Sequence, residues 1–258
     1  MLKAYMKAET LKNTHTVLSK LFLLVPLVSV GIAVFFSGWD TRYYQMNQYN
    51  WWYIIFYPML LLLSTAFAVQ RERRMKNRVI SALPVNLKKL WAAKVAYIVK
   101  VLLIASAIVY CAWEIFSRLF ASGGARGISS GAGFGAAILW VILSLWQIPL
   151  WLFINQIFGF GVGIILGLAG NVGLGVIGAL EGWWLLNPFS YISRVMCPVL
   201  GILPNGLPAV PGSQTFFEGV LDRSVIPAGV GMSVLLFIIS YVLTAGWYQR
   251  KGDAGWEN

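Results

Sequence analysis

The sequence predicts an all-α integral membrane protein that forms one domain over residues 1–258 and crosses the membrane six times. Composition is the first reason, because 59% of the residues are hydrophobic and only 11% are charged, whereas a soluble chain has roughly 25% charged residues. The mean hydropathy of +0.72 agrees with this class. The second reason is that the apolar residues form runs near the ~20 residues that a helix needs to cross the hydrocarbon core. Six such runs leave little chain for a globular enzyme domain.

The apolar runs define the six candidate spans. The first run lacks an obvious small-residue cleavage site, so we expect it to be a retained span and not a signal peptide. The six predicted spans cover residues 18–37, 51–69, 95–116, 136–154, 159–180 and 225–247.

The basic residues predict that both chain termini lie in the cytoplasm. The net charge is +11, but Lys and Arg lie beside the ends of the apolar runs, which suits membrane topology and anionic lipid and excludes a nucleic-acid interpretation. An even number of spans places residues 1–17, 70–94 and 248–258 on one side. Fourteen Lys and Arg lie on that side or at its border, against five on the other. The positive-inside rule therefore makes it the cytoplasmic side.

The basic connection between the second and third spans contains a short amphipathic pattern. Met75, Val79 and Leu83 recur every four residues among arginines, which predicts a helix over residues 71–82 that ends before Pro84. Two interpretations remain open at this point. The segment either adheres to anionic lipid or docks a cytoplasmic partner.

Small residues line one side of the fifth predicted span. Their four-residue spacing lets helices approach closely in lipid, where burial of apolar surface drives little association. We expect Asn171 to form an interhelical hydrogen bond, with contact to a substrate as the alternative. In the fourth span, Gln147 and Pro149 indicate a polar contact and a kink. The stripe consists of Gly159, Gly163, Gly167, Asn171 and Gly175.

The stretch over residues 181–224 alternates aromatic residues with prolines. It is too apolar for a free loop and too interrupted for a span. We expect a pair of interfacial or re-entrant helices that pack against the other spans, because their backbone groups must be hydrogen-bonded within the protein.

The chemistry of an enzyme or a metal site is missing from the sequence. There is no phosphate-binding Gly-x-x-x-x-Gly-Lys-Ser/Thr loop and no Gly-x-Ser-x-Gly elbow, and His15 is the single histidine. Cys111 and Cys197 are not expected to pair. Lys100 and Glu114 lie in one predicted helix about 21 Å apart, too far for an acid–base pair, and we expect them to extend toward the membrane surfaces. The sequence thus predicts neither catalysis nor a bound cofactor or metal in this chain.

A series of short motifs runs almost the whole length of the chain. They are Ala8-Glu9 with Lys12, Asn50-Trp51-Trp52-Tyr53, Leu83-Pro84-Val85, Leu87-Lys88-Lys89-Leu90-Trp91 with Lys94, Asn187-Pro188-Phe189-Ser190-Tyr191 with Arg194, Cys197-Pro198, and Pro204-Asn205-Gly206. Their order and spacing resemble the lantibiotic-immunity permeases of the MutE/EpiE group, a branch of the type-2 ABC exporter permeases.

This resemblance implies a transport subunit in a bacterial cell membrane that expels a lantibiotic or similar antimicrobial peptide and so protects its producer. It also implies a second related permease and two copies of a cytoplasmic ATPase, which would bind ATP and Mg²⁺ in place of this chain. The helix over residues 71–82 would couple to the ATPase, with Arg71, Glu72, Met75 and Val79 at the contact. The second cytoplasmic connection, residues 155–158, is short and uncharged, so we expect no sizeable docking element there.

The resemblance implies that residues 181–224, here called the outer segment, form outer re-entrant helices, and we expect this segment to line the path of the peptide. Trp183 and Tyr191 would offer apolar and cation-binding faces, and Glu218 and Asp222 would meet a cationic peptide. The alternative is that the aromatic residues anchor broken helices at the membrane interface while the acids are simply solvated. An exporter of lipid, ion or drug and a membrane-embedded enzyme are the alternative functions.

Overall fold

A computed structural model describes residues 2–36, 41–81, 85–119 and 127–254. Within these ranges the regular elements are helices, and the single β-bridge joins Ile202 to Pro208. Five helices are long and apolar enough to cross a membrane, or six if one bent pair counts as a single span. The all-α class is therefore confirmed, and the helices are consistent with a multi-pass membrane protein.

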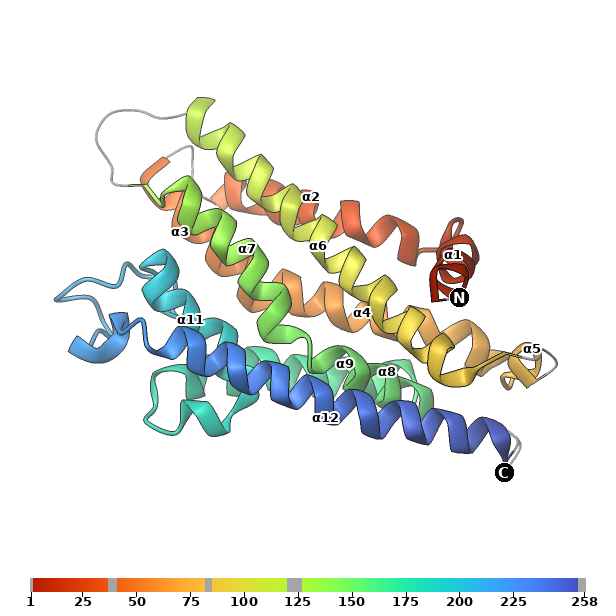
Figure 1. The fold of residues 1–258 in the computed structure, drawn as a ribbon. Helices are drawn as coiled ribbons and strands as arrows, with labels where there is room; N and C mark the ends of the chain where they lie inside the picture. The colour runs from red at the N-terminus through yellow and green to blue at the C-terminus, as the bar shows by residue number, and fades with distance from the viewer. Residues whose placement is uncertain (1, 37–40, 82–84, 120–126, 255–258) are drawn as a thin grey trace.

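The spans follow one another along a bundle of roughly aligned helices (Figure 1). The first is α2 (Leu18–Phe36), and the second begins in α3 (Thr41–Trp51) and continues through the π-helical turn η1 (Trp52–Phe56) into α4 (Tyr57–Arg74). The third is α6 (Leu87–Leu119), and the bent pair is α7 (Ser130–Ser144) with α8 (Gln147–Ile157). The fifth combines α9 (Phe160–Leu168), η2 (Ala169–Leu174), α10 (Gly175–Ile177) and η3 (Gly178–Leu180), and the last is α12 (Val225–Asp253).

The bend in the fourth span has a local cause. The axes of α7 and α8 differ by 46°, and Pro149 lies in the first turn of α8. Its ring nitrogen cannot donate to the carbonyl of Leu145, and the ring collides with that carbonyl, so a straight helix cannot pass this point. The kink expected from the sequence is therefore present.

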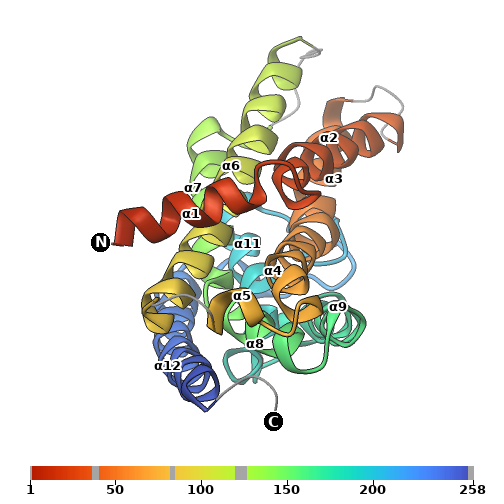
Figure 2. The same ribbon diagram turned by 90° about the vertical axis from the view of Figure 1, so that its right-hand side faces the viewer.

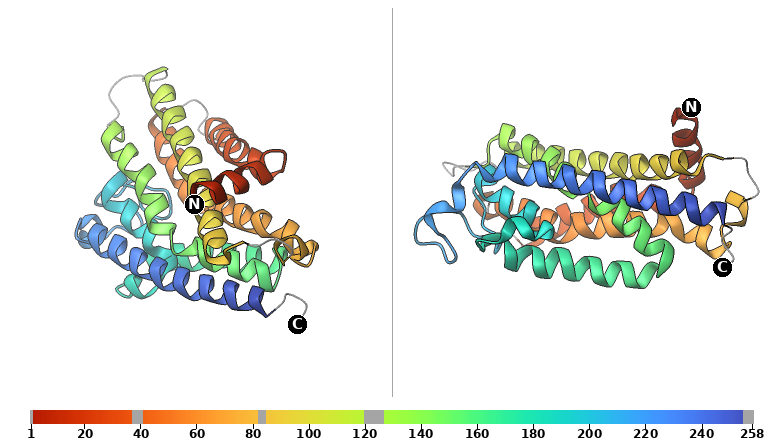
Figure 3. Two further views of the ribbon diagram at one scale, coloured as in Figure 1. Left: turned by 45° about the vertical axis from the view of Figure 1, so that its right-hand side comes forward. Right: turned by 60° about the horizontal axis from the view of Figure 1, so that its bottom comes forward.

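Helix α1 (Leu2–Asn13) was not predicted, and it lies across one end of the bundle instead of along it (Figure 2). Both ends of the described chain lie at this end, together with α5 (Arg78–Ser81) (Figures 1 and 3). We call it the basic end, defined by α1, residues 70–81 and the last turns of α12. The segment over residues 181–224 lies at the opposite end of the bundle (Figure 3).

The connection after α4 differs from the prediction. Helix α4 ends at Arg74, and α5 begins only at Arg78. Lys76 and Asn77 between them have φ angles of 50° and 54°, in the left-handed region, where asparagine is more common than most residues. The Asn77 amide donates to the Glu72 carbonyl at 2.8 Å and closes the end of α4. The prediction of one continuous helix over residues 71–82 is therefore wrong; Ala82, Leu83 and Pro84 lie outside the described residues.

The opposite end contains one α-helix where a pair was expected. The short 3-10 turns η4 (Trp184–Leu186) and η5 (Pro188–Ser190) lead into α11 (Tyr191–Leu200), which is buried along most of its length. Gly201, with a φ angle of 68°, ends α11. Turns then follow up to η6 (Glu218–Leu221). The prolines at 204, 208 and 211 prevent a second helix, because each lacks the donor that a helix interior needs.

The core beside α11 is aromatic. The ring of Tyr49 lies 5.6 Å from that of Trp113 and 5.7 Å from that of Trp140, which in turn lies 6.3 Å from Trp52. All four side chains are almost completely buried. These rings therefore pack α3, η1, α6 and α7 against one another.

Candidate functional site

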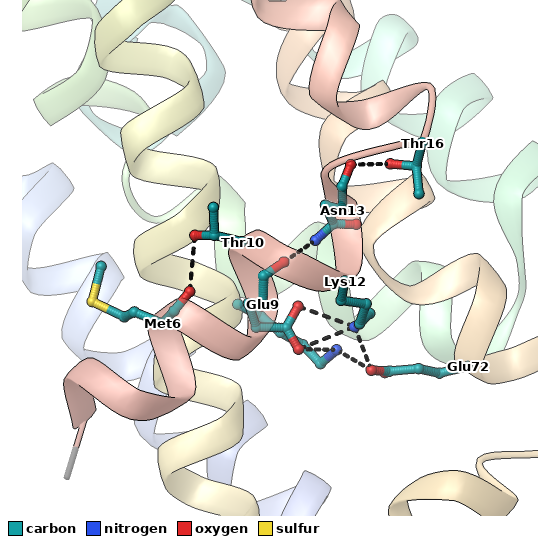
Figure 4. Close-up of polar contacts among 8 residues, drawn as sticks. Met6, Glu9, Thr10, Lys12, Asn13, Thr16 and Glu72 are labelled. Carbon is teal, nitrogen blue, oxygen red and sulfur yellow. Dashed lines mark hydrogen bonds and ion pairs between the residues drawn. The ribbon is translucent and has the colours of Figure 1, made fainter.

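Four charged side chains meet at the basic end (Figure 4). Glu9 and Lys12 come from α1, Glu72 from the last turn of α4 and Lys94 from α6. Oε1 of Glu72 lies 2.6 Å from Nζ of Lys12 and 2.6 Å from Nζ of Lys94. Glu9 completes the network, with its carboxylate 3.0 Å from Lys12 and 3.4 Å from Lys94. We call these four residues the charge cluster.

The charge cluster is balanced and largely removed from solvent. The side chain of Lys94 is 0% exposed and that of Glu9 is 3% exposed. Buried charges are tolerated only when they are paired, and here two cations face two carboxylates. Burial, reinforced by the positive charge of Lys94, lowers the pKa of Lys12, although Glu72 and Glu9 oppose the change. The cluster therefore holds the crossing helix α1 against the ends of two spans.

The chain around the cluster keeps α1 in this position. Asn13 donates from Nδ2 to the Glu9 carbonyl at 2.8 Å, and Thr16 donates to the Asn13 carbonyl at 2.9 Å, which closes the turn from α1 into α2. One turn before Lys94, Trp91 donates to Oγ1 of Thr244 at 3.1 Å and joins α6 to α12. Helices α1, α4, α6 and α12 are thus linked at one end.

The predicted ATPase-contact residues lie at this end in different environments. Arg71 and Met75 are exposed, with 47% of Met75 accessible. Glu72 is turned into the charge cluster. Val79 lies in α5. The structure thus brings all four residues to one end and leaves Arg71 and Met75 on its surface.

The small residues of the fifth span face other helices. A Cβ at Gly167 would overlap the side chain of Leu62 in α4, and one at Gly163 would overlap that of Asn155 in α8. Asn171 exchanges two hydrogen bonds with Gln147, each 2.9 Å long. Gln147 also accepts from Trp151 at 3.0 Å. Asn171 thus makes an interhelical contact of the kind expected in lipid.

The four predicted peptide-contact residues are not equivalent. Trp183 is 47% exposed, and Glu218 and Asp222 are also exposed. Asp222 accepts hydrogen bonds from the amide and hydroxyl of Ser224, which lower the pKa of its carboxyl. Tyr191 is buried and donates to the Leu185 carbonyl at 2.9 Å. Three of the four are therefore accessible at the protein surface, and Tyr191 has a structural contact instead.

Arg194 has a role that the sequence did not indicate. It is only 5% exposed and donates to the carbonyls of Val220 and Gly219 at 2.6 and 2.8 Å. Its guanidinium also lies 5.7 Å from the ring centre of Phe217. These contacts attach η6 to α11, so the buried guanidinium of Arg194 holds the turns of the outer segment in place.

Two of the motifs quoted above meet in space. Asn50 at the end of α3 donates to Tyr53 at 3.0 Å and to the carbonyls of Leu203 and Pro204 at 3.4 Å. Gly206, with a φ angle of 85°, lies against the same amide. The second span thus supports the outer turns directly.

The described residues contain no group of three or more His, Cys, Asp and Glu side chains that could hold a metal ion. Comparisons of the chain with protein-family models, with curated proteins and with solved structures found no match.

Proposed function

We propose that the chain is the permease subunit of an ABC exporter that removes a lantibiotic or similar antimicrobial peptide from a bacterial membrane. A separate cytoplasmic ATPase, present in two copies, would supply the energy, and a second related permease would complete the membrane part. The proposal is supported by the multi-pass helical bundle and by the motif resemblance. It requires no catalytic residue in this chain, because ATP binding and hydrolysis would shift the permease between conformations.

The observation that carries the proposal is the surface of the basic end. An exposed apolar side chain, Met75, stands among exposed arginines and lysines where α4 gives way to α5. Behind it, Glu72 links this turn to α1 and α6 through the charge cluster. Force applied by a partner at Met75 would therefore reach three helices at once. Such a rigid connection is what a coupling surface needs.

At the opposite end, the proposed peptide contact is the exposed part of the outer segment. Trp183 offers an aromatic face, and Glu218 and Asp222 offer negative charge to a cationic peptide. The two ends are connected by continuous helices, so a shift at one end can change the exposure of the other. This arrangement supports a mechanism in which the ATPase, bound at the basic end, changes the conformation of the peptide path at the opposite end.

Copurification tests the proposal. The tagged chain, produced together with its neighbouring gene products, should retain an ATPase, and candidate peptides should stimulate that ATPase. The Met75→Asp/Val79→Asp variant should lose the ATPase while inserting normally in the membrane. Leu11→Asp is the matched control, because Leu11 is a 64% exposed apolar residue on α1 at the same end. Equal ATPase recovery from both variants would make the docking assignment wrong, and peptide turnover by the chain alone would favour a membrane-embedded enzyme.

An exporter of lipid, ion or drug is the alternative within the same class. It predicts the same ATPase partner but stimulation by a different solute. Trp183→Ala and Glu218→Gln distinguish the two, because both residues are exposed and their loss should reduce stimulation by peptide without disturbing assembly.

A further inference from the structure

A cavity of about 300 Å³ lies at the basic end, where α4 passes the turn between α8 and α9. This volume is at the lower end of the range for small-molecule sites, roughly 300–1,000 Å³. It suits a polar head group better than a whole lipid or a peptide. The lining residues are Ala66, Gln70, Arg73, Arg74, Asn155 and Phe160.

Two arginines make the cavity electropositive. Nη2 of Arg73 donates to the Ile157 carbonyl at 3.2 Å, which leaves other N–H groups of the guanidinium for a ligand. Gly159, with a φ angle of 94°, permits this placement, since a Cβ there would stand 2.6 Å from Nη1 of Arg73. None of the ion pairs found in the described residues involves Arg73 or Arg74. Two neighbouring cations without carboxylates favour an anion, and guanidinium groups match phosphate oxygens well.

Asn155 adds a buried hydrogen-bonding group to the same lining. Its side chain is 1% exposed, and its Nδ2 donates to Oγ1 of Thr65 at a long 3.4 Å. Its Oδ1 is buried without a hydrogen-bond partner in the described part of the chain. That oxygen has no surface open to the cavity and faces Gly163 of α9. Asn155 therefore shapes the cavity, and the two arginines supply the charge that a ligand would meet.

An apolar surface adjoins the cavity. Helix α9 begins with the lining residue Phe160 and then leaves Val162, Ile165 and Leu166 exposed by 40%, 69% and 53%. Exposed apolar side chains on a spanning helix face either acyl chains or another helix. Beside a cationic cavity at the end of the spans, they match the acyl chains of a lipid whose head group lies in the cavity.

We propose that this cavity binds the phosphate head group of an anionic phospholipid, for example phosphatidylglycerol. The two arginines would hold the phosphate, and the acyl chains would lie along α9. The proposal is independent of what the chain transports. It makes α9 and α4 responsive to the lipid composition of the leaflet at the basic end.

Native mass spectrometry of the purified full chain in neutral detergent tests the site. With equal amounts of phosphatidylglycerol and phosphatidylcholine, the wild-type chain should retain one phosphatidylglycerol in preference. Arg73→Gln/Arg74→Gln should weaken that retention roughly thirtyfold, since each cation near an anionic surface contributes roughly fivefold. Lys3→Gln/Lys7→Gln is the charge-matched control, because both lysines are exposed on α1 at the same end, away from the cavity. Equal losses in the two variants would show general charge attraction and overturn the site.

A second variant separates the cavity from its charges. Ala66→Leu would place two more methyl groups and a methine into the space while keeping both arginines, and it should also lose the preference. If Ala66→Leu retains the lipid, the head group does not enter the cavity and the proposal is wrong.

Inorganic phosphate alone should give no thermal stabilisation. If it stabilises the chain as much as phosphatidylglycerol does, the site takes free phosphate. If Arg73→Gln/Arg74→Gln loses a copurifying ATPase but keeps the lipid, the arginines serve the partner and the lipid assignment falls.

Discussion

Lys94 is the residue of the charge cluster whose loss should lower the stability of the protein most. Its ammonium is 0% exposed and reaches both Glu72 and Glu9, so Lys94→Met leaves two buried carboxylates sharing Lys12. Breaking a buried ion pair in this way costs about 3–5 kcal/mol, because the remaining charge is uncompensated. We expect a loss of that size in the free energy of unfolding, measured with denaturant in detergent micelles.

The controls for this prediction lie in the same helix and the same cluster. Lys100→Met removes an exposed lysine from α6 and should change stability by no more than about 0.5 kcal/mol. Glu72→Gln combined with Lys94→Met should recover part of the loss, since one cation and one carboxylate would remain paired. Similar small effects of Lys94→Met and Lys100→Met would show that the cluster does not stabilise α1.

At the residue scale, the sequence predicted that isolated amides within apolar spans form polar contacts, but it did not predict their partners. Gln147 and Asn171 were each expected to form such a contact, and the structure shows that they contact each other. Glu9, Lys12 and Lys94 look like ordinary topology-setting charges, and no local pattern brings residues 85 positions apart together. The available signal was indirect, because all three occur in the motifs that carry the family resemblance.

Among the elements, the contact between α10 and η5 gives the clearest steric prediction. A Cβ on Gly175 would stand 2.9 Å from the carbonyl oxygen of Phe189, a backbone atom in a turn that begins with Pro188. Because the backbone there cannot move cheaply, Gly175→Ala should lower the free energy of unfolding by about 1–3 kcal/mol.

Gly173→Ala is the matched control for this substitution. A Cβ on Gly173 meets nothing within 4 Å, and alanine favours a helix over glycine by about 1 kcal/mol. Gly173→Ala should therefore be neutral or stabilising when the same unfolding measurement is made. If Gly175→Ala is equally harmless, α10 does not pack on η5 as described.

The spans could be predicted from the sequence because apolar runs of sufficient length leave few alternatives, and the bend at Pro149 follows from one residue. Helix α1 was missed because half of its residues are polar and its apolar residues form no continuous face. The break after Arg74 was missed because the four-residue spacing of Met75 and Val79 predicted a continuous helix. Asn77 takes the left-handed conformation instead, which ends α4. In the outer segment, the prolines allowed one helix and excluded its expected partner.

For the whole molecule, the arrangement of the two ends predicts a labelling pattern. Both ends of the described chain and the basic connection lie at one end of the bundle (Figure 1), and the positive-inside rule predicts that this end faces the cytoplasm. In a background without Cys111 and Cys197, a cysteine replacing Ser213 should react with an impermeant reagent in intact cells, whereas one replacing Lys76 should react only after the cells are opened. Labelling of Lys76→Cys in intact cells would contradict this orientation.

The proposed ATPase surface and the proposed peptide surface lie at opposite ends of the bundle, and only the family resemblance suggested this separation from the sequence. The charge cluster would transmit motion from the proposed ATPase surface, and the exposed Trp183 and Glu218 would meet the peptide at the other end. The buried contacts of Tyr191 and Arg194 position that second surface and do not form it. In the proposed exporter, transport would be a property of the whole bundle.

The most direct test of the central claim is ATP-driven removal of a peptide from the membrane. Vesicles that contain the chain, its permease partner and the ATPase should release a membrane-bound cationic lanthionine peptide when ATP is added on the ATPase side. Trp183→Ala should reduce that release while basal ATP hydrolysis continues. If ATP is hydrolysed but the peptide stays in the membrane at the level of vesicles without the chain, the chain is not an exporter of such peptides.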